Sequence, residues 1–168
     1  MRVILAIMIA LPLLAGFEAP ALAQAQTQAQ TQAQADCPAT ETMRGGRNNY
    51  RIDVPLVENL GIGWTASGTV REAGSCAPLA GVTVKLWSAT DRGGERDPSN
   101  HGATLTDAEG RYRMPFSEIR PMGGQLHIHV AVDQPEYEPL FLRPVLAPGD
   151  TEGMVVDFVL KPTGRNAS

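Results

Sequence analysis

The sequence predicts an all-β protein, a single β-sandwich of about seven strands. Short segments in which apolar and polar residues alternate recur between residues 65 and 160. The chain contains 17 glycines and 13 prolines, and many of them separate these segments as turn residues do. Beyond the first 23 residues, no segment has the 3.6-residue periodicity of an amphipathic helix. Together these observations favour a sandwich over a helical or mixed fold.

The expected strands of the first half are residues 65–70, 82–87, 103–106 and 111–116. The second of them alternates strictly, with Val82, Val84 and Leu86 on one face. The last two flank residues 107–110, Asp-Ala-Glu-Gly, which is a sequence typical of a hairpin turn.

Three more strands are expected in the second half, at residues 125–132, 137–143 and 154–160. The first carries His127 and His129 on one face and Leu126, Ile128, Val130 and Val132 on the other, because residues two apart in a strand point the same way. In the last, Met154, Val156, Phe158 and Leu160 share one side.

The N-terminal segment indicates export. Arg2 precedes an apolar run, and Ala21-Leu22-Ala23 forms a small-x-small cleavage site, so we expect residues 1–23 to be a signal peptide. The apolar run is too short for a membrane anchor, and no later segment reaches membrane length. The mature protein is therefore expected to be periplasmic or secreted, and not embedded in a membrane.

About 145 residues remain after cleavage, enough for one domain with its own core. We expect residues 24–49, which begin with a repetitive Gln/Ala-rich tract, to form a disordered tether and arm, and residues 50–168 to form the sandwich. The net charge is −4 and the only lysines are Lys85 and Lys161, which argues against nucleic acid as a partner. The oligomeric state is left open.

The two cysteines, Cys37 and Cys76, are expected to form a disulfide, since an exported chain folds in an oxidising compartment. Such a bond would tie the N-terminal arm to the turn after the first strand. The alternative, in which both are thiolate metal ligands, is disfavoured because their separation matches no zinc-site spacing.

The pair His127 and His129 is the main candidate for chemistry. The chain has three histidines, and the side chains of these two project together from one strand, a spacing that suits chelation of one metal ion. The alternative is the solvent-facing side of a strand that carries two histidines by chance. His101, in a long charged and glycine-rich loop, is a further candidate ligand. No nucleophile elbow, Walker loop or Cys-His pair is present.

The order of motifs resembles the intradiol ring-cleavage dioxygenases, the family of catechol and protocatechuate dioxygenases. Four pieces carry the resemblance: Gly68-Thr69-Val70 leading to residues 78–87 (PLAGVTVKLW), then residues 106–112 (TDAEGRY), then His127-Ile128-His129, and then Pro148-Gly149-Asp150. The first piece also resembles transthyretin-like sandwiches. Trp87 and the His-Ile-His strand favour the dioxygenases.

The resemblance implies a non-haem ferric iron held by two histidines and two tyrosinates. The histidines carry over to His127 and His129, but both tyrosines are missing. Glu95 stands where the first is expected, eight residues beyond Trp87, and residues 119–126 lack the second. Tyr112, in the strand after the turn, is the remaining tyrosine candidate. Two neutral imidazoles with Glu95 or His101 would suit Fe(II), copper or zinc.

Two functions follow from the sequence. In the first, the chain is an exported metal-binding protein related to intradiol dioxygenases, which would cleave catecholic substrates with oxygen and non-haem iron. In the second, it is a non-catalytic transthyretin-like sandwich that acts as a metal carrier or binding module. Whether the chain is an enzyme at all is open, because the tyrosines are absent.

Overall fold

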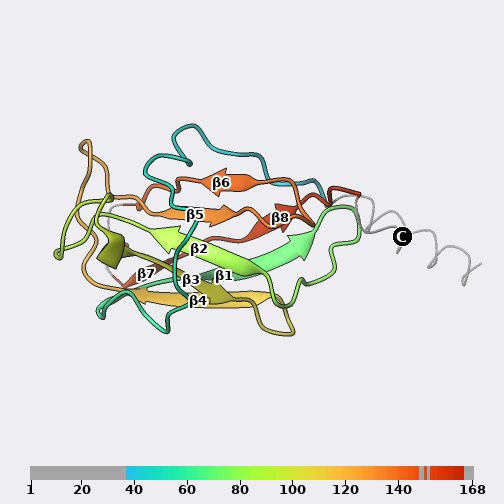
Figure 1. The fold of residues 1–168 in the computed structure, drawn as a ribbon, viewed down its shortest axis with the longest axis horizontal. Helices are drawn as coiled ribbons and strands as arrows, with labels where there is room; N and C mark the ends of the chain where they lie inside the picture. Colours follow the sequence, from blue (N-terminus) through green and yellow to red (C-terminus); the bar gives the residue numbers. More distant parts are fainter. Residues whose placement is uncertain (1–36, 148–149, 151, 165–168) are drawn as a thin grey trace, which may run out of the picture. The chain divides into compact units, whose positions relative to one another are not determined.

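The computed structural model describes residues 37–147, 150 and 152–164, so the expected signal peptide and the Gln/Ala-rich tract lie outside the described residues. The described part is a sandwich of two four-stranded sheets with one short 3-10 turn, Pro98–Asn100, as its helical element (Figure 1). The predicted all-β sandwich is confirmed. Within the described residues, no helix is long and apolar enough to span a membrane.

The first sheet has the strand order β4-β1-β7, and β8 pairs with the far end of β1. Its strands are β1 (Trp64–Glu72), β4 (Arg111–Phe116), β7 (Gly153–Val155) and β8 (Phe158–Leu160). The β1 and β4 strands are antiparallel, whereas β7 and β8 run parallel to β1. The single strand expected at residues 154–160 is therefore two short strands, although Met154, Val156, Phe158 and Leu160 do point inward as predicted.

The second sheet has the strand order β3-β2-β5-β6, and all its pairs are antiparallel. Its strands are β2 (Thr83–Trp87), β3 (His101–Leu105), β5 (His129–Val132) and β6 (Leu140–Leu142). Two of them differ from expectation. β3 begins at His101, which is expected in the preceding loop. β5 begins at His129, which leaves His127 in an isolated bridge to Val145.

The main core lies between the two sheets and contains twenty buried apolar residues from both. A smaller apolar cluster lies on the outer face of the second sheet, where Tyr50 packs against Trp87, Ala131 and Phe141. The second sheet is thus buried on both faces, and all four residues of β5 are buried. Its outer face must therefore be covered by other parts of the chain.

One cover is the segment from Cys37 to Tyr50, which we call the arm; it is drawn in cyan and runs along the outside of β6 (Figure 1). Its backbone bonds to β6 and β8, through Met43 N to the Phe141 carbonyl at 2.9 Å and Thr40 N to the Val159 carbonyl at 2.9 Å. The expected disulfide between Cys37 and Cys76 is confirmed, with Cα atoms 5.6 Å apart. It joins the start of the arm to the turn after β1.

Candidate metal centre

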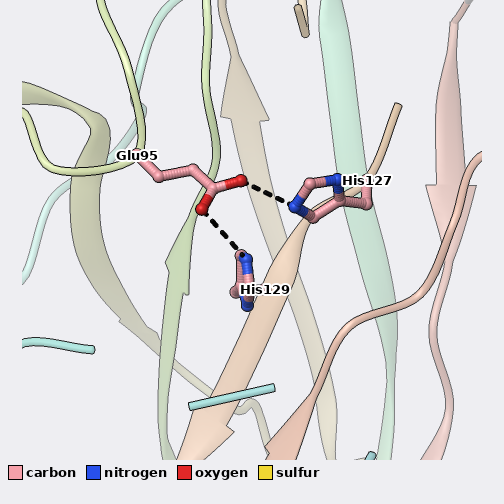
Figure 2. Close-up of side chains that lie close together, drawn as sticks. All are labelled: Glu95, His127 and His129. Atoms are coloured by element: carbon pink, nitrogen blue, oxygen red, sulfur yellow. Dashed lines mark ion pairs between the residues drawn. The ribbon is translucent and has the colours of Figure 1, made fainter. Parts of the chain in front are cut away.

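Glu95, His127 and His129 form a buried group on the outer face of the second sheet. Each offers one donor atom, and the three donors lie within 4.8 Å of one another. Glu95 Oε1 lies 2.6 Å from His127 Nε2, and Glu95 Oε2 lies 3.6 Å from His129 Nε2. Figure 2 shows the Glu95 carboxylate between the two imidazoles, approached by both Nε2 atoms. The exposed fractions are 4% for Glu95, 3% for His127 and 0% for His129.

The other ring nitrogens of the two histidines face backbone carbonyls. His129 Nδ1 lies 3.0 Å from the Gly46 carbonyl oxygen, and His127 Nδ1 lies 3.1 Å from that of Gln125. A carbonyl oxygen only accepts, so His129 Nδ1 carries the proton in its contact and His129 Nε2 is left with its lone pair. This arrangement orients metal-ligating histidines in many proteins. His127 differs, because the Arg143 guanidinium, which only donates, approaches its Nδ1 at 3.2 Å. His127 Nε2 then carries the proton and donates to Glu95 Oε1, and a bound metal ion would displace that proton.

Glu95 is held as a carboxylate despite its burial. Burial raises its pKa, but contacts with His127, His129 and the Asn49 amide outweigh this and hold the pKa of Glu95 well below its usual range. Asn49 Nδ2 donates to Glu95 Oε2 at 2.8 Å. The group therefore combines one negative charge with two imidazoles.

The fold brings Glu95 to this place through a braced loop between β2 and β3. Asn100 is fully buried, and its side-chain amide donates to the carbonyls of Gly93 and Gly94 at 2.9 and 3.1 Å. Thr90 Oγ1 donates to Asn100 Oδ1 at 2.8 Å. His101 Nε2 donates to the Glu95 carbonyl at 2.6 Å. The loop backbone at Glu95 and just before it is therefore fixed from within.

His101 supports the group without joining it. In the sheet register Trp87 pairs with both His101 and His129, so the three side chains lie side by side on one face. The rings are nearly parallel, with the indole centroid 5.7 Å from His101 and 4.7 Å from His129. Burial lowers the pKa of His101, so the ring is neutral. Its Nε2 is occupied by Glu95 and the indole lies between it and His129.

The three tyrosines of the chain are all described, and their hydroxyl groups are placed elsewhere. Tyr112 is buried in the first sheet, and its hydroxyl donates to the Val156 carbonyl at 2.8 Å. Tyr50 bonds to Asp133 and Lys85. Tyr137 pairs through its backbone with Pro162. Of the candidate ligands from the sequence, the structure brings together His127, His129 and Glu95, and it leaves out His101 and Tyr112.

The donor set fits a metal ion. His129 Nε2 is buried and has no hydrogen-bond partner among the described residues, which is costly unless another group satisfies it. Two imidazoles and a carboxylate are the ligands of two-histidine, one-carboxylate centres, which hold Fe(II), and of comparable zinc sites. Without tyrosinates, the set does not match the ferric iron that the resemblance implies.

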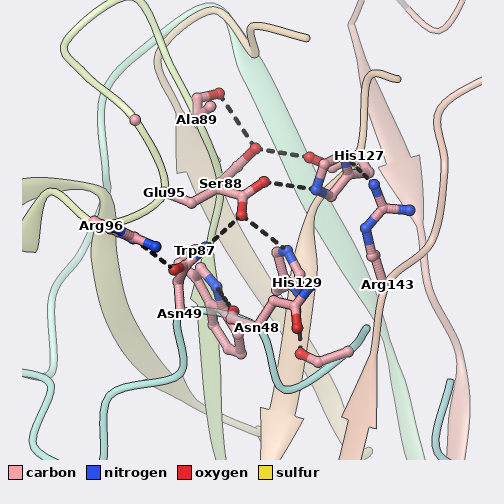
Figure 3. A network of polar contacts seen from close by, with 12 residues as sticks. Asn48, Asn49, Trp87, Ser88, Ala89, Glu95, Arg96, His127, His129 and Arg143 are labelled. Carbon is pink, nitrogen blue, oxygen red and sulfur yellow. Dashed lines mark hydrogen bonds and ion pairs between the residues drawn. The ribbon is translucent and has the colours of Figure 1, made fainter. Parts of the chain in front are cut away.

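Four residues around the group have no signal in the sequence, namely Gly46, Asn49, Gln125 and Arg143. Figure 3 shows Asn49 and Arg143 in the polar network around Glu95 and the histidines. Arg143 also donates to Gln125 Oε1 at 3.0 Å. The two residues that face His127 Nδ1, Arg143 and Gln125, are therefore bonded to each other. Gly46, Asn49 and Arg143 belong to no motif, because each reaches the site only through the folding of a distant segment.

The structure also has a cleft of about 770 Å³. Its wall includes Trp64, Ile119, Gln125, Leu126 and Leu146. Gln125 and Leu126 immediately precede His127, but none of the three donor side chains lines the cleft. One donor, His127, is therefore next in sequence to residues of the cleft wall, but all three donor side chains are buried and do not open into the cleft.

Comparison with solved structures identifies the fold. This chain is similar to the dioxygenase domain of a dioxygenase carbohydrate-binding protein fusion from Streptomyces sp. SirexAA-E, with a TM-score of 0.55. The two are 23% identical, and the match covers 75% of this chain and 99% of that one. Hydroxyquinol 1,2-dioxygenase from Pseudomonas putida DLL-E4 is 16% identical over 84% of this chain and 71% of that one, with a TM-score of 0.59. Catechol 1,2-dioxygenase from Pseudomonas arvilla C-1 is 18% identical over 85% and 68%, with a TM-score of 0.54.

The described domain therefore has the fold of the intradiol dioxygenases, as the sequence motifs predict. No protein-family model matches the chain, and no curated protein sequence matches it. Because the solved structures share less than a quarter of their residues with this chain, they define its fold, and its activity must be argued from the site.

Proposed function

We propose that this protein binds one transition-metal ion through His127, His129 and Glu95, and that it acts on catecholic substrates with oxygen. The observation that supports the metal centre most directly is the enclosed donor set. Two Nε2 atoms and one carboxylate converge within 4.8 Å, and both Nδ1 atoms face backbone carbonyls. The donor types favour Fe(II), Cu(II) or Zn(II) over ferric iron.

The proposed activity rests on the fold shared with catechol and hydroxyquinol dioxygenases. A bound redox-active ion would supply the Lewis acidity and the one-electron chemistry that catechol cleavage by oxygen needs. In this chain Glu95 would offset the positive charge of the ion, and His127 and His129 would hold it against the sheet. The cleft beside Gln125 and Leu126 is the candidate entrance for a small aromatic substrate.

A second candidate function is a non-catalytic metal carrier. It is favoured by the burial of all three donors and by their absence from the wall of the cleft. Closed sites with few open positions are typical of metals that are held and not used in catalysis. The same three ligands serve both functions, so only turnover separates them.

The test is to load the purified mature protein separately with Fe(II), Cu(II) and Zn(II) and to measure bound metal by mass spectrometry after gel filtration. Oxygen uptake and ring-cleavage products are then measured with catechol, protocatechuate and hydroxyquinol. His127→Ala and His129→Ala should each abolish metal retention, whereas Glu109→Gln, an exposed carboxylate, should not. One metal per chain with ring cleavage supports the enzyme, and one metal without oxygen uptake supports the carrier. Equal metal content in all variants contradicts both.

We also propose that the protein is exported, with residues 1–23 removed, residues 24–49 as a tether and arm, and residues 50–168 as the sandwich. The disulfide between Cys37 and Cys76 is compatible with an oxidising compartment. N-terminal sequencing of the protein recovered from the periplasm or medium should begin at Gln24. Full-length protein confined to the cytoplasm would contradict export.

A further inference from the structure

The arm is part of the wall of the candidate metal centre. Within four residues it makes three contacts with the group: the Gly46 carbonyl faces His129 Nδ1 at 3.0 Å, Asn49 Nδ2 donates to Glu95 Oε2 at 2.8 Å, and the Asn48 carbonyl accepts from Trp87 Nε1 at 3.0 Å. The arm therefore sets the tautomer of one ligand, anchors the second and holds the ring that stacks on the first.

The fit of the arm leaves little freedom at its centre. Gly46 is buried against β6, and a Cβ at this position would overlap the Phe141 carbonyl. Only glycine can lie this close, so Gly46 places its own carbonyl against His129. A small outward shift of the arm would withdraw this acceptor and the Asn49 amide together.

Tyr50, the last residue of the arm, packs against Trp87 and Phe141. Apart from this anchor and the Gly46 contact, the arm is held mainly by hydrogen bonds. Residues 41–44 are exposed, so they bury little apolar surface. Thr40 exchanges two bonds with Val159, both 2.9 Å long, and Met43 N bonds to the Phe141 carbonyl. A segment with few apolar contacts opens at a low free energy, well below that of global unfolding.

The disulfide fixes the far end of this segment. Cys37 and Cys76 are separated by 39 residues in the sequence, and the Cys37 carbonyl also accepts from Gly74 N at 3.0 Å. Both cysteines are only partly buried, so a reductant can reach them. A crosslink of this span restricts the freedom of the chain it closes.

We propose that the arm is a redox-controlled strap on the metal centre, so that the metal is held tightly while Cys37 and Cys76 are joined and released faster when they are reduced. The inference rests on the proposed metal site. A dithiol reductant breaks the Cys37–Cys76 bond by thiol exchange. The two cysteines gain two electrons and two protons as thiols, and the reductant becomes a disulfide. The freed arm then opens more often and removes the Gly46 and Asn49 contacts from the ligands.

The experiment measures the transfer of bound Zn(II) to a chromogenic chelator. Oxidised protein is compared with protein reduced by dithiothreitol, alkylated with iodoacetamide and freed of both reagents before zinc is added. Reduction should shorten the half-time of release by about 10- to 100-fold, the usual effect of losing outer contacts to metal ligands. The double variant Cys37→Ser/Cys76→Ser should behave like the alkylated protein, and it excludes zinc binding by free thiols.

Two further variants separate the strap from general loosening. Asn49→Ala in the oxidised protein should accelerate release in the same direction, because it breaks one arm contact without touching the disulfide. Met114→Ala, a fully buried residue of the first sheet, destabilises the fold at a distance from the arm and should leave the release rate unchanged. Circular dichroism confirms that each protein is folded at the assay temperature. If the double variant does not fold, the alkylated protein and Asn49→Ala carry the test.

Equal release from oxidised and alkylated protein overturns the strap and leaves the metal centre standing. Acceleration by Met114→Ala equal to that caused by reduction also overturns it, because loosening anywhere would then suffice. Failure of the oxidised protein to retain zinc overturns the strap together with the proposed centre.

Discussion

The two sheets of this sandwich differ in what lies on their outer faces. In the first sheet, β1 and β4 alternate between buried residues and residues that reach solvent, as expected when one side packs on a core and the other meets water. In the second sheet, β5 and β6 are buried throughout, and the outer face holds two histidines, Trp87 and a carboxylate under the arm and the loop before β3.

This difference between the outer faces shows where the buried polar residues lie, namely outside the core that holds the two sheets together. The core between the sheets is complete with apolar side chains from both. The buried polar residues Glu95, His101 and His129 are not in that core, and burying them is costly unless they are satisfied. Glu95 and His129 belong to the proposed metal centre, and the following predictions test the contrast between the two sheets.

The largest effect on stability is expected from removing a large buried ring from either sheet. Trp87→Ala and Phe116→Ala should each lower the free energy of unfolding by about 3–5 kcal/mol, because both rings are almost completely buried. Only Trp87→Ala should also lower zinc affinity, since Trp87 stacks on His129 and Phe116 lies in the first sheet. Denaturant titration and zinc titration give the two readouts. Equal loss of zinc affinity in both variants would show that the covered face has no special role.

Glu95→Gln removes the charge of the group and keeps its shape. We expect zinc affinity to fall by at least about 100-fold, because losing a ligand costs more than the 10- to 100-fold effect of outer contacts. The matched change Glu109→Gln, in the exposed turn of the first sheet, should leave the affinity unchanged. Competition with a chelator of known affinity measures both. Full zinc affinity in Glu95→Gln would remove this residue from the ligand set.

Alkaline pH should act on the first sheet through Tyr112. Burial raises its pKa above the usual 10.0, so the folded state keeps a proton that the unfolded state loses. The stability from this group is complete below pH 10 and falls by up to about 1.4 kcal/mol per pH unit as the pH rises toward the folded-state pKa. Tyr112→Phe should flatten this slope and cost about 1 kcal/mol at neutral pH through the lost bond to Val156. Denaturant titrations from pH 8 to 11 measure it, and an unchanged slope in Tyr112→Phe would contradict it.

The smallest effect is expected at the outer face of the first sheet. Arg111 pairs with Asp107 and Glu109 at 2.9 and 2.6 Å, but its side chain is 62% exposed. Solvent screening makes such pairs weak, so Arg111→Ala should leave the denaturation midpoint and zinc retention unchanged. A midpoint shift comparable to that of Tyr112→Phe would mean that the exposed ion pairs of this face contribute to the free energy of unfolding.

Much of the fold was predictable because local rules decide it. Turn residues predicted the turn at residues 107–110, and the boundaries of Arg111–Phe116 are those expected. The expected hairpin is wrong, because β3 pairs with β2 in the second sheet and β4 pairs with β1 in the first, so this turn connects the two sheets. The spacing of His127 and His129 gave their convergence, since two residues in extended chain share a face whatever surrounds them. The disulfide followed from the number of cysteines and the expected compartment.

The surroundings of the site could not be predicted, because distant segments make them. Nothing in the polar, glycine-rich arm indicates that Gly46 and Asn49 contact residues that lie between 46 and 83 positions away. His101 was expected in a loop, but the strand register places it beside Trp87. Glu95 is a candidate ligand from the sequence because it follows Trp87 by eight residues. Its burial could not be predicted, because it depends on the loop contacts of Asn100, which have no periodic pattern in the sequence.

The stacking of Trp87 on His129 gives the protein an optical reporter of its own. The chain has two tryptophans, and the other, Trp64, packs against Phe116 at the start of the first sheet. A Trp64→Phe variant would emit only from the indole that stacks on His129, a proposed metal ligand. Paramagnetic ions such as Cu(II) quench a neighbouring indole, whereas closed-shell Zn(II) does not. The emission intensity would therefore distinguish a redox-active occupant from a closed-shell one without a label.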